Sequence, residues 1–576
     1  MSHQGNTVRV RPFRFPCPTH DERRGSTRTR RSSDSLAAVW AWLFAVLAAL
    51  AGPSTSAVAA PQSPTDDVLH LQRRITYGPT ATESLVLLAG YPTSLQTFLS
   101  AQLGPAQPES SALQLLLADI QPNVSQGEVW SIDRLGRDYV ARALYSRNQL
   151  REWMAYFLFS HFNVGYGKVN NDLEEIITFF SLPNSASEDA TLLIRDNLEF
   201  LRQNAFGNFG TLLTHIVKSP ATIVYLDNHR NNAALGVNEN LAREALELYS
   251  LGLNPDGSPN GFNQSTDVNG FAHVLSGHIL NLSPAQPHWV PFFSGLFHDL
   301  APYQGATLFA SSVGGGYTIG ATESGPAVLD NVLAHIAMME ETARFISRKL
   351  YRAFVSDVAT PPSTLIDAMV ADWMASNGNL GVVLDRLLHD LDFWSTSHRM
   401  GKVKTPLEGL VSTVRAFDGQ ASNENQLTNL MAELSQSGQT LFTHPSPDGF
   451  PFASEEHATT WKDLRRVKFN RSLNEGVASQ YAGTIYYDWF GLLNQMQVSP
   501  SNTVGVAQSF LLLQYGTTLT NTDQQLALSF LSTKVDGVTP DVGLDRLIQT
   551  GAIAAWNDRV SQYAAFAASF AQSYLK

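Results

Sequence analysis

Apolar residues recur at helical spacing along most of the chain. The stretch from Ala190 to Gln203 shows this period and ends in the polar run before Gly207. Thr522 to Gln525 reads as a capping box that opens a helix through Leu531. The same period predicts further helices over 212–217, 329–354, 365–374, 380–391 and 553–575. Strand alternation is scarce, so we predict an all-α fold.

One region departs from this pattern. The stretch from Trp289 to Gly320 is aromatic and Gly-rich, and we expect a short hairpin or an ordered loop there. The fold is then a large multi-helix body, of one or two lobes, with one irregular insert. The expected division has an N-terminal helical half, the insert, a second helical half and a C-terminal helical segment, over residues 60–290, 291–325, 326–498 and 499–576.

The most polar of the predicted helices runs from Val237 to Gly252. Its period puts Glu239, Arg243 and Glu247 on one stripe, at i, i+4 spacing. Asn238 is the expected N-cap, and Gly252 the residue beyond the C-terminus.

Two interpretations of this helix stay open. In the first, the stripe is an exposed ladder in which each ion pair contributes ~0.2 to 0.5 kcal/mol. In the second, it is a working site. Glu239 and Glu244 lie about 140° apart on a helix, so one pairs with Arg243 and the other is free for proton transfer or metal binding.

The first 59 residues have the layout of an export signal. A basic leader precedes an apolar run from Leu36 to Ala51, followed by small residues, and we expect cleavage after Ala59 or Ala60. The apolar run is shorter than the ~20 residues that span a bilayer, so a retained anchor is the less favoured alternative. Arg30 and Arg31 suggest a twin-arginine route, but Ser33 stands where that signal has an apolar residue, so the choice between this route and general secretion stays open. We therefore predict a periplasmic or extracellular protein.

Loss of the leader changes the charge and removes the only thiol. The leader carries eight arginines and three acids, so the net charge falls from −12 for the whole chain to −17. An acidic protein repels phosphate backbones, and a nucleic-acid partner is excluded. The basic stretch from Lys462 to Arg471 reads as a solvated helix face. Cys17 is the single cysteine and lies in the leader, so disulfides and thiol chemistry are also excluded.

Other polar clusters give weaker signals. We predict no cofactor, but the alternative that His161, His273, His278, His298 and Asp299 hold a divalent metal stays open, although no histidine pair has the i, i+4 spacing of zinc ligands. The loop 254–261 fails the calcium-loop pattern and is expected to be a surface turn. Arg344 and Lys349 are expected to pair with acids. The segment 445–451 places Asp448 beside aromatic residues, which suits either a hydrophobic plug or stacking on a sugar ring.

Several motifs in order along the chain carry a family resemblance. They lie at 73–79, 153, 161–162, 225–228, 237–252, 265–278, 297–299, 342–350, 402–408 and 447–451. Together they resemble the bacterial family known as domain of unknown function 1800, over roughly Leu69 to Asn474. The sequence departs from that family at His278, where an aromatic residue is usual, and after Asp299, where a lysine is missing. The family has no settled activity. Relatives are often encoded beside a second exported family similar to sulfatases and phosphatases, which implies an exported partner.

Two hypotheses of function follow. The first is a non-enzymatic envelope or extracellular protein that binds a partner or acts as a scaffold. The second is an exported hydrolase or lyase that acts on a polymer such as a polysaccharide through a Glu/Arg/His cluster. Under the second, the candidate catalytic residues are Glu239, Glu244, Arg243, Asp227 and His161. The candidate substrate-binding residues are Asn240, Glu247, His278, His298, Asp299 and Asp448.

Overall fold

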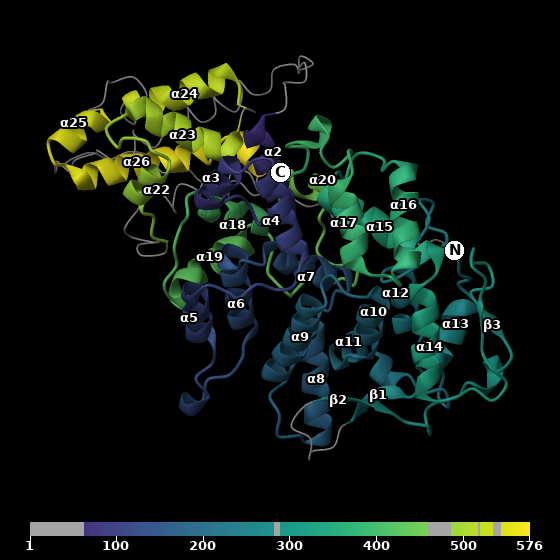
Figure 1. The fold of residues 1–576 in the computed structure, drawn as a ribbon. Helices are drawn as coiled ribbons and strands as arrows, with labels where there is room; N and C mark the ends of the chain where they lie inside the picture. Colours follow the sequence, from purple (N-terminus) through teal and green to yellow (C-terminus); the bar gives the residue numbers. More distant parts are fainter. Residues whose placement is uncertain (1–62, 282–288, 459–484, 517–518, 534–542) are drawn as a thin grey trace, which may run out of the picture.

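The computed structural model describes residues 63–281, 289–458, 485–516, 519–533 and 543–576. The expected leader and the basic stretch from Lys462 to Arg471 lie outside these residues. Helices make up nearly all of the regular structure in the described ranges, so the all-α prediction is confirmed (Figure 1). None of the described helices combines the length and the apolar character needed to cross a membrane.

The first half of the chain supplies helices that surround a common centre. Their bounds are α2 (Pro64–Ile75), α3 (Ala81–Ala89), α4 (Thr93–Leu103), α5 (Ser111–Ile120), α6 (Ile132–Tyr145), α7 (Gln149–His161), α8 (Tyr166–Phe180), α9 (Ala186–Gln203), α10 (Phe209–Lys218), α11 (Pro220–Tyr225), α12 (Asn240–Glu247) and α13 (Asp267–Leu275). Short 3-10 turns lie at Val124–Gln126 and Asn228–Arg230.

Two small antiparallel hairpins follow α13, in and beside the irregular insert. Strand β1 (His278–Asn281) pairs with β2 (Val290–Phe293), with His278 opposite Phe293. Strand β3 (Thr307–Leu308) pairs with β4 (Tyr317–Thr318). The expected hairpin in this region is therefore confirmed.

The rest of the chain is again helical. The bounds are α14 (Pro326–Ala337), α15 (Glu340–Phe354), α16 (Ser363–Ala375), α17 (Leu380–His389), α18 (Pro406–Ala416), α19 (Glu424–Gln436), α20 (Ser454–His457), α22 (Trp489–Gln495), α23 (Thr503–Tyr515), α24 (Asn521–Ser532), α25 (Leu544–Gln549) and α26 (Ile553–Ala567). Further 3-10 turns lie at Ala301–Tyr303, Thr396–His398 and Ala571–Tyr574.

The helices α7 and α18 form the interior of the larger body. Every residue of α18 is buried, and so is every residue of α7 except Arg151. A helix that is covered on all sides belongs to the core of a large protein. These two helices position the polar groups described below, since no face of either is left to solvent.

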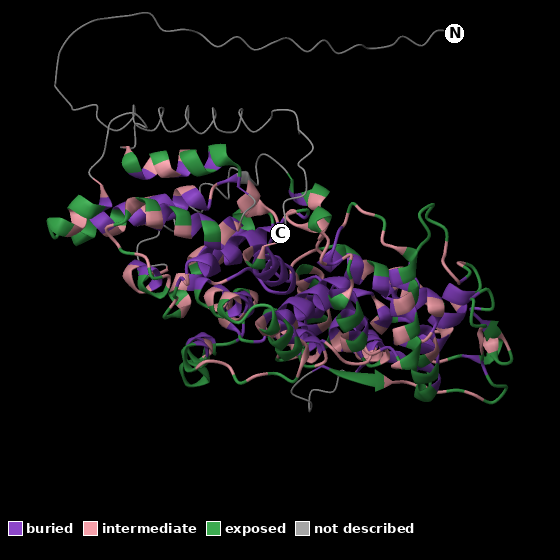
Figure 2. Cartoon of the chain, turned by 45° about the horizontal axis from the view of Figure 1, so that its top comes forward, coloured by how far each residue is buried: buried purple, intermediate pink, exposed green. Residues whose placement is uncertain are grey.

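The described residues form two apolar cores. The larger core takes residues from Val68 to Phe442, on both sides of the insert, and the smaller one is built mainly by α22 to α26. Figure 1 shows α22 to α26 beside α2 and α3, at the end of the molecule away from α13 and β3. Figure 2 shows buried residues running through the middle of the molecule and exposed residues on its rims.

Four local expectations were wrong in detail. The helix expected over 553–575 ends at Ala567, and a 3-10 turn follows it. The helix expected over 329–354 is broken at Met338 and Met339 into α14 and α15. The capping box of α24 is formed by Thr520 and Asp523, two residues before the expected one, because Thr520 Oγ1 lies where it accepts from the Asp523 N–H. The polar helix is only α12, since Glu239 occupies the N-cap position and helical structure ends at Glu247.

Candidate functional site

Four asparagines fix the entry into α12. Asn231 is fully buried and accepts a hydrogen bond from the Asn238 N–H at 3.0 Å. It also donates to the carbonyl of Ala272, on α13, and to Asn228 Oδ1. The side chains of Asn238 and Asn240 donate to the carbonyls of Asp227 and Leu226. These amides satisfy the backbone groups of a non-helical turn and tie α11, α12 and α13 together.

The expected ion-pair ladder is present on the outer face of α12. Arg243 lies 3.0 Å from Glu239 Oε2 and 3.9 Å from Glu247 Oε1. Gln264 accepts from Arg243 at 2.6 Å and donates to Glu247, and Asn269 donates to Glu239 at 2.8 Å. The side chains of Glu239 and Arg243 are more than a third exposed. Every charge in this ladder is matched, so it fits a structural role better than proton transfer.

Glu244 lies on another face of α12 and has different surroundings. Within the described part of the chain its side chain has no hydrogen bond or ion pair. Burial raises the pKa of this carboxyl, and the charges of Glu247 and Asp448 raise it further, while Arg243 opposes them. Desolvation and nearby negative charge both favour the protonated acid. The helix thus separates a paired acid, Glu239, from an unpaired one.

His161 and Lys349 form a close polar pair between α7 and α15. His161 ends α7 and is buried, and its Nδ1 atom lies 2.9 Å from Lys349 Nζ, which comes from α15. Its Nε2 atom lies 3.1 Å from the carbonyl oxygen of Tyr249. Burial lowers the pKa of His161 well below its usual value, and the charge of Lys349 lowers it further. His161 is therefore a neutral core histidine.

The loop that carries Asp448 closes over the end of α7. Gly449 has a φ of +82°, and a Cβ there would lie 1.9 Å from the carbonyl oxygen of Ser160, so only glycine fits. Tyr225 Oη donates to the carbonyl of Pro445 at 2.7 Å, and Asn163 donates to the carbonyls of His444 and Ser446. These contacts hold the backbone of the loop and leave the Asp448 side chain 66% exposed.

The charge of Asp448 affects the pKa values of both Glu244 and Lys349. It raises the pKa of Glu244 and opposes the burial that lowers the pKa of Lys349 to about 8. Burial raises the pKa of Tyr225 to about 12, with smaller contributions from Glu244 and Asp448. We call His161, Tyr225, Glu244, Lys349 and Asp448 the Lys349 cluster. Three of its members, His161, Glu244 and Asp448, are among the residues predicted from the sequence.

The other predicted site residues lie elsewhere. Asp227 has a φ of +59° and pairs with Lys168 at 3.1 Å and Arg230 at 3.6 Å. His278 and His298 flank Phe293, each with its ring centroid 5.0 Å from the phenyl ring. His298 Nδ1 donates to the carbonyl of Ser276, and Asp299 accepts from the Ala301 N–H. These residues form no common centre with α12.

Tyr225 and Lys349 are the two members of the cluster that were not predicted as site residues, and a different role was predicted for Lys349. It was expected to pair with an acid, as Arg344 does with Glu340 and Asp367, and this expectation was wrong for Lys349. The two basic residues are five positions apart and leave α15 on different sides. Lys349 lies one turn after Phe345 on the half-buried side of α15. This i, i+4 spacing from an aromatic residue is the sequence signal that distinguishes Lys349 from Arg344.

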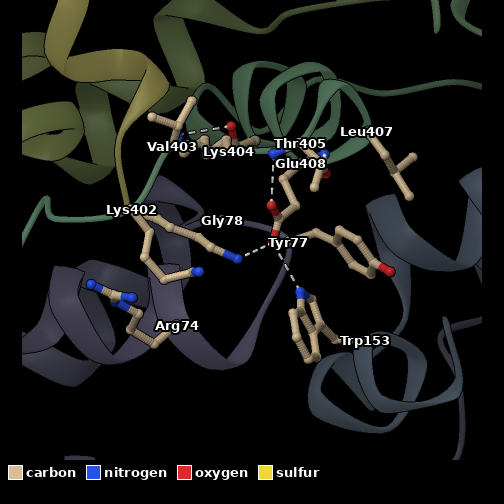
Figure 3. Close-up of polar contacts among 12 residues, drawn as sticks. Arg74, Tyr77, Gly78, Trp153, Lys402, Val403, Lys404, Thr405, Leu407 and Glu408 are labelled. Carbon is tan, nitrogen blue, oxygen red and sulfur yellow. Dashed lines mark hydrogen bonds and ion pairs between the residues drawn. The ribbon is translucent and has the colours of Figure 1, made fainter. Parts of the chain in front are cut away.

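A second polar cluster is fully internal and is formed by three of the sequence motifs. Glu408, on α18, accepts hydrogen bonds from the Thr405 N–H at 2.9 Å and from the Trp153 indole at 3.0 Å (Figure 3). It also forms an ion pair with Lys576. Lys402 lies 2.9 Å from Asp357 and donates to the carbonyl of Arg352.

The charges in this internal cluster are balanced by their neighbours. Burial alone would raise the pKa of Glu408, but Lys576 and the hydrogen bonds to the carboxylate lower it to about 2. Arg74 is fully buried and donates to the carbonyls of Val355 and His398. The network joins α2, α7 and α18, and its ion pairs and hydrogen bonds fit a structural role, although Arg74 Nε has no hydrogen-bond partner among the described residues.

No group of three or more possible metal-ligating side chains is present among the residues that the structure describes. A groove of about 520 Å³ lies between α10 and α14, and it is lined by residues that include Asn208, Thr211, His215 and Asp330. None of the residues predicted from the sequence lines this groove.

Comparison with known protein families gives a match over most of the chain. Residues 70–544 match the model of a family described as a protein of unknown function (DUF1800). This range includes α12, the Lys349 cluster and the motifs around Glu408. No curated protein and no solved structure matches significantly.

Proposed function

The chain belongs to the DUF1800 family, and from this membership and the Lys349 cluster we propose that it is an exported protein that binds a polyhydroxylated polymer, such as a polysaccharide. The observation that carries the proposal is the pair of carboxylates, Glu244 and Asp448, on neighbouring elements at the surface. Glu244 has no side-chain partner in the described residues, and Asp448 is 66% exposed. Carboxylates accept hydrogen bonds from hydroxyl groups, which are the polar groups of a neutral sugar.

Charge narrows the class of ligand. The whole chain carries a net charge of −12, and the mature chain becomes more acidic after loss of the basic leader. Long polyanions are repelled by such a surface, so neutral polymers are favoured. Support for export comes from the basic and apolar layout of the first 59 residues.

Affinity electrophoresis tests the binding. The mature protein is run through gels that contain a neutral soluble polysaccharide such as xylan, a β-glucan or starch, and we expect retardation in at least one of them. The variants Glu244→Gln and Asp448→Asn should lose that retardation. Glu340→Gln removes the same charge at a surface ion pair of α15 and is the matched control. Equal mobility of all four proteins in every gel contradicts the proposal.

A second candidate function is hydrolysis of the same polymer. It is favoured by the raised pKa of Glu244, with the carboxyl group of Asp448 nearby, because glycoside hydrolysis uses a pair of carboxyl groups of which one is a protonated acid. Glu244 is then the general acid, and turnover falls as the pH rises through its pKa. Reducing-end assays should show that Glu244→Gln loses turnover. Glu239→Gln should keep it, since Glu239 belongs to the ladder on the other face.

The exported partner implied by the family resemblance is also a proposal. The half-exposed ladder of α12 offers paired charges to a partner surface, and this is the binding or scaffold role expected from the sequence. A neighbouring exported protein, expressed with this chain, should then co-purify with it. Reversal of the charges at Arg243 and Glu247 should abolish that co-purification.

A further inference from the structure

Lys349 has surroundings unlike those of a surface lysine. Its Nζ atom lies 2.9 Å from His161 Nδ1 and 5.2 Å from the centroid of the Phe345 ring. Within the described residues no carboxylate lies at ion-pair distance from it, whereas Lys168 is held by both Asp172 and Asp227. The side chain is half-buried, so it is not sealed in the interior.

The hydrogen bonds of His161 show which of its ring nitrogens faces Lys349 as an acceptor. The carbonyl oxygen of Tyr249 can only accept, so His161 Nε2 carries the proton. His161 Nδ1 then has a lone pair and accepts from Lys349. The ammonium group therefore has a neutral acceptor as its close partner, and a neutral acceptor also accommodates the uncharged amine.

The charged groups around Lys349 act in opposite directions. Burial lowers its pKa to about 8; Asp448, from the loop above, opposes this change, and Arg352, on the same helix, adds to it. At pH 8 about half of the Lys349 side chains are then uncharged, against less than about 1% for an ordinary lysine. Lys168, whose pKa is raised despite partial burial because of its two aspartates, stays protonated at that pH.

We propose that Lys349 is a reactive amine that forms an imine with aldehydes and ketones, including the open-chain reducing ends of saccharides. Nζ attacks the carbonyl carbon and forms a C–N bond. The carbonyl oxygen leaves as water and takes the two amine protons, so the product is the imine and one molecule of water. A desolvated lysine without an ion-pair partner is the form of this side chain that serves as a nucleophile.

This inference goes beyond the binding of a polymer. Imine formation is measured with a small aldehyde, in the absence of any polysaccharide. A protein that fails to bind polymers can therefore still form the imine at Lys349, and a protein that binds polymers can fail to form it.

Selective labelling of the whole mature protein tests the inference. Glycolaldehyde and sodium cyanoborohydride trap the imine as a stable secondary amine, and digestion followed by mass spectrometry gives the rate at each lysine between pH 7 and 10. At pH 8 we expect Lys349 to react roughly tenfold faster than Lys168. Its rate should reach half of its plateau near pH 8. Equal rates for the two lysines, or a rate at Lys349 that rises as steeply as that of Lys168 up to pH 10, overturn the proposal.

A variant on the exposed loop supplies a second test. Asp448→Asn removes the carboxylate that raises the pKa of Lys349, so the labelling profile should move to lower pH. Glu340 pairs with Arg344 and not with the Lys349 cluster, so the control variant Glu340→Gln should leave the pH profile of Lys349 labelling unchanged. A profile that does not move in Asp448→Asn contradicts the arrangement proposed for the cluster.

Discussion

Glu239 and Glu244 lie five positions apart on one short helix, and their surroundings differ. Glu239 contacts Arg243 and Asn269, whereas the side chain of Glu244 has no polar partner in the described residues. The sequence predicted this separation from helical spacing alone. It could not predict that Asp448, more than 200 residues later, lies close enough to raise the pKa of Glu244. That proximity depends on how the loop packs on α7.

Stability measurements distinguish the two acids. Glu239→Gln breaks a half-exposed ion pair, so we expect it to lower the free energy of unfolding by at most ~1 kcal/mol. Glu244→Gln replaces an acid that costs free energy when ionised in its site, so stability near pH 7 should stay the same or rise slightly. Urea unfolding of the two variants beside the wild type gives both values. A larger loss in Glu244→Gln than in Glu239→Gln is incompatible with this assignment.

At the scale of elements, the fold depends on polar contacts that connect helices far apart in the sequence. The capping box of α18 uses Glu408 to bind the Thr405 N–H, and the same carboxylate accepts from Trp153 on α7. One side chain thus caps the start of α18 and connects that helix to α7 and to Lys576. The motif from Lys402 to Glu408 was visible in the sequence, but its partners were not, because ion pairs between distant segments leave no periodic pattern.

The buried Glu408 predicts a specific pH dependence. The folded protein lowers its pKa from the ordinary value of 4.5 to about 2. The ionised carboxylate therefore contributes stability that is fully present above about pH 4.5 and is lost as the pH falls toward 2. Glu408→Gln leaves Lys576 without its partner and should cost ~3 to 5 kcal/mol at pH 7.

Thermal melts between pH 2 and 7 check this prediction. The wild type should lose Tm steeply below pH 4.5, and Glu408→Gln should show a shallower loss from a lower starting point. Glu433→Gln is a useful comparison, since Glu433 is buried on α19, outside the network of Lys402 and Lys576. Parallel pH profiles for the wild type and Glu408→Gln are the result that this account does not allow.

Element boundaries show where sequence patterns were sufficient. The apolar period placed α9, α10, α16 and α17 well, because their buried faces are continuous. It missed the break between α14 and α15, since Met338 and Met339 continue an apolar run while the backbone turns. It also extended the polar helix too far, because the asparagines before α12 bind backbone groups of α11 and α13 in preference to a helical turn.

At the scale of the whole molecule, two apolar cores lie side by side. The smaller core depends on Trp556, which is fully buried, stacks on Phe490 with centroids 4.2 Å apart, and donates to the carbonyl of Pro500. Trp373 occupies a comparable position in the larger core. The smaller core is built mainly by α22 to α26, and α3 and α18 contribute residues to both cores. Damage to the smaller core should therefore leave helices that belong to the larger core alone, such as α7, closed.

A pair of variants tests this independence. Trp556→Ala should cost ~3 to 5 kcal/mol within the smaller core. Hydrogen exchange should then rise in α23 and α26, while α7 and α9, which contribute to the larger core alone, keep their protection. Trp373→Ala should instead raise hydrogen exchange in helices of the larger core, while α23 and α26 keep their protection. If Trp556→Ala instead raises exchange equally in all four helices, the two cores unfold as one cooperative unit.

Helix α7 carries Trp153 in its middle and His161 at its end, so this buried helix contributes both to the internal polar cluster around Glu408 and to the Lys349 cluster. Because α7 is buried, a substitution in this helix should lower the stability of the fold more than it changes which ligand is bound. New ligand specificities should therefore arise through substitutions in α12 and in the loop that holds Asp448. We expect relatives with different ligands to differ there first, and to keep the interior of α7 almost unchanged.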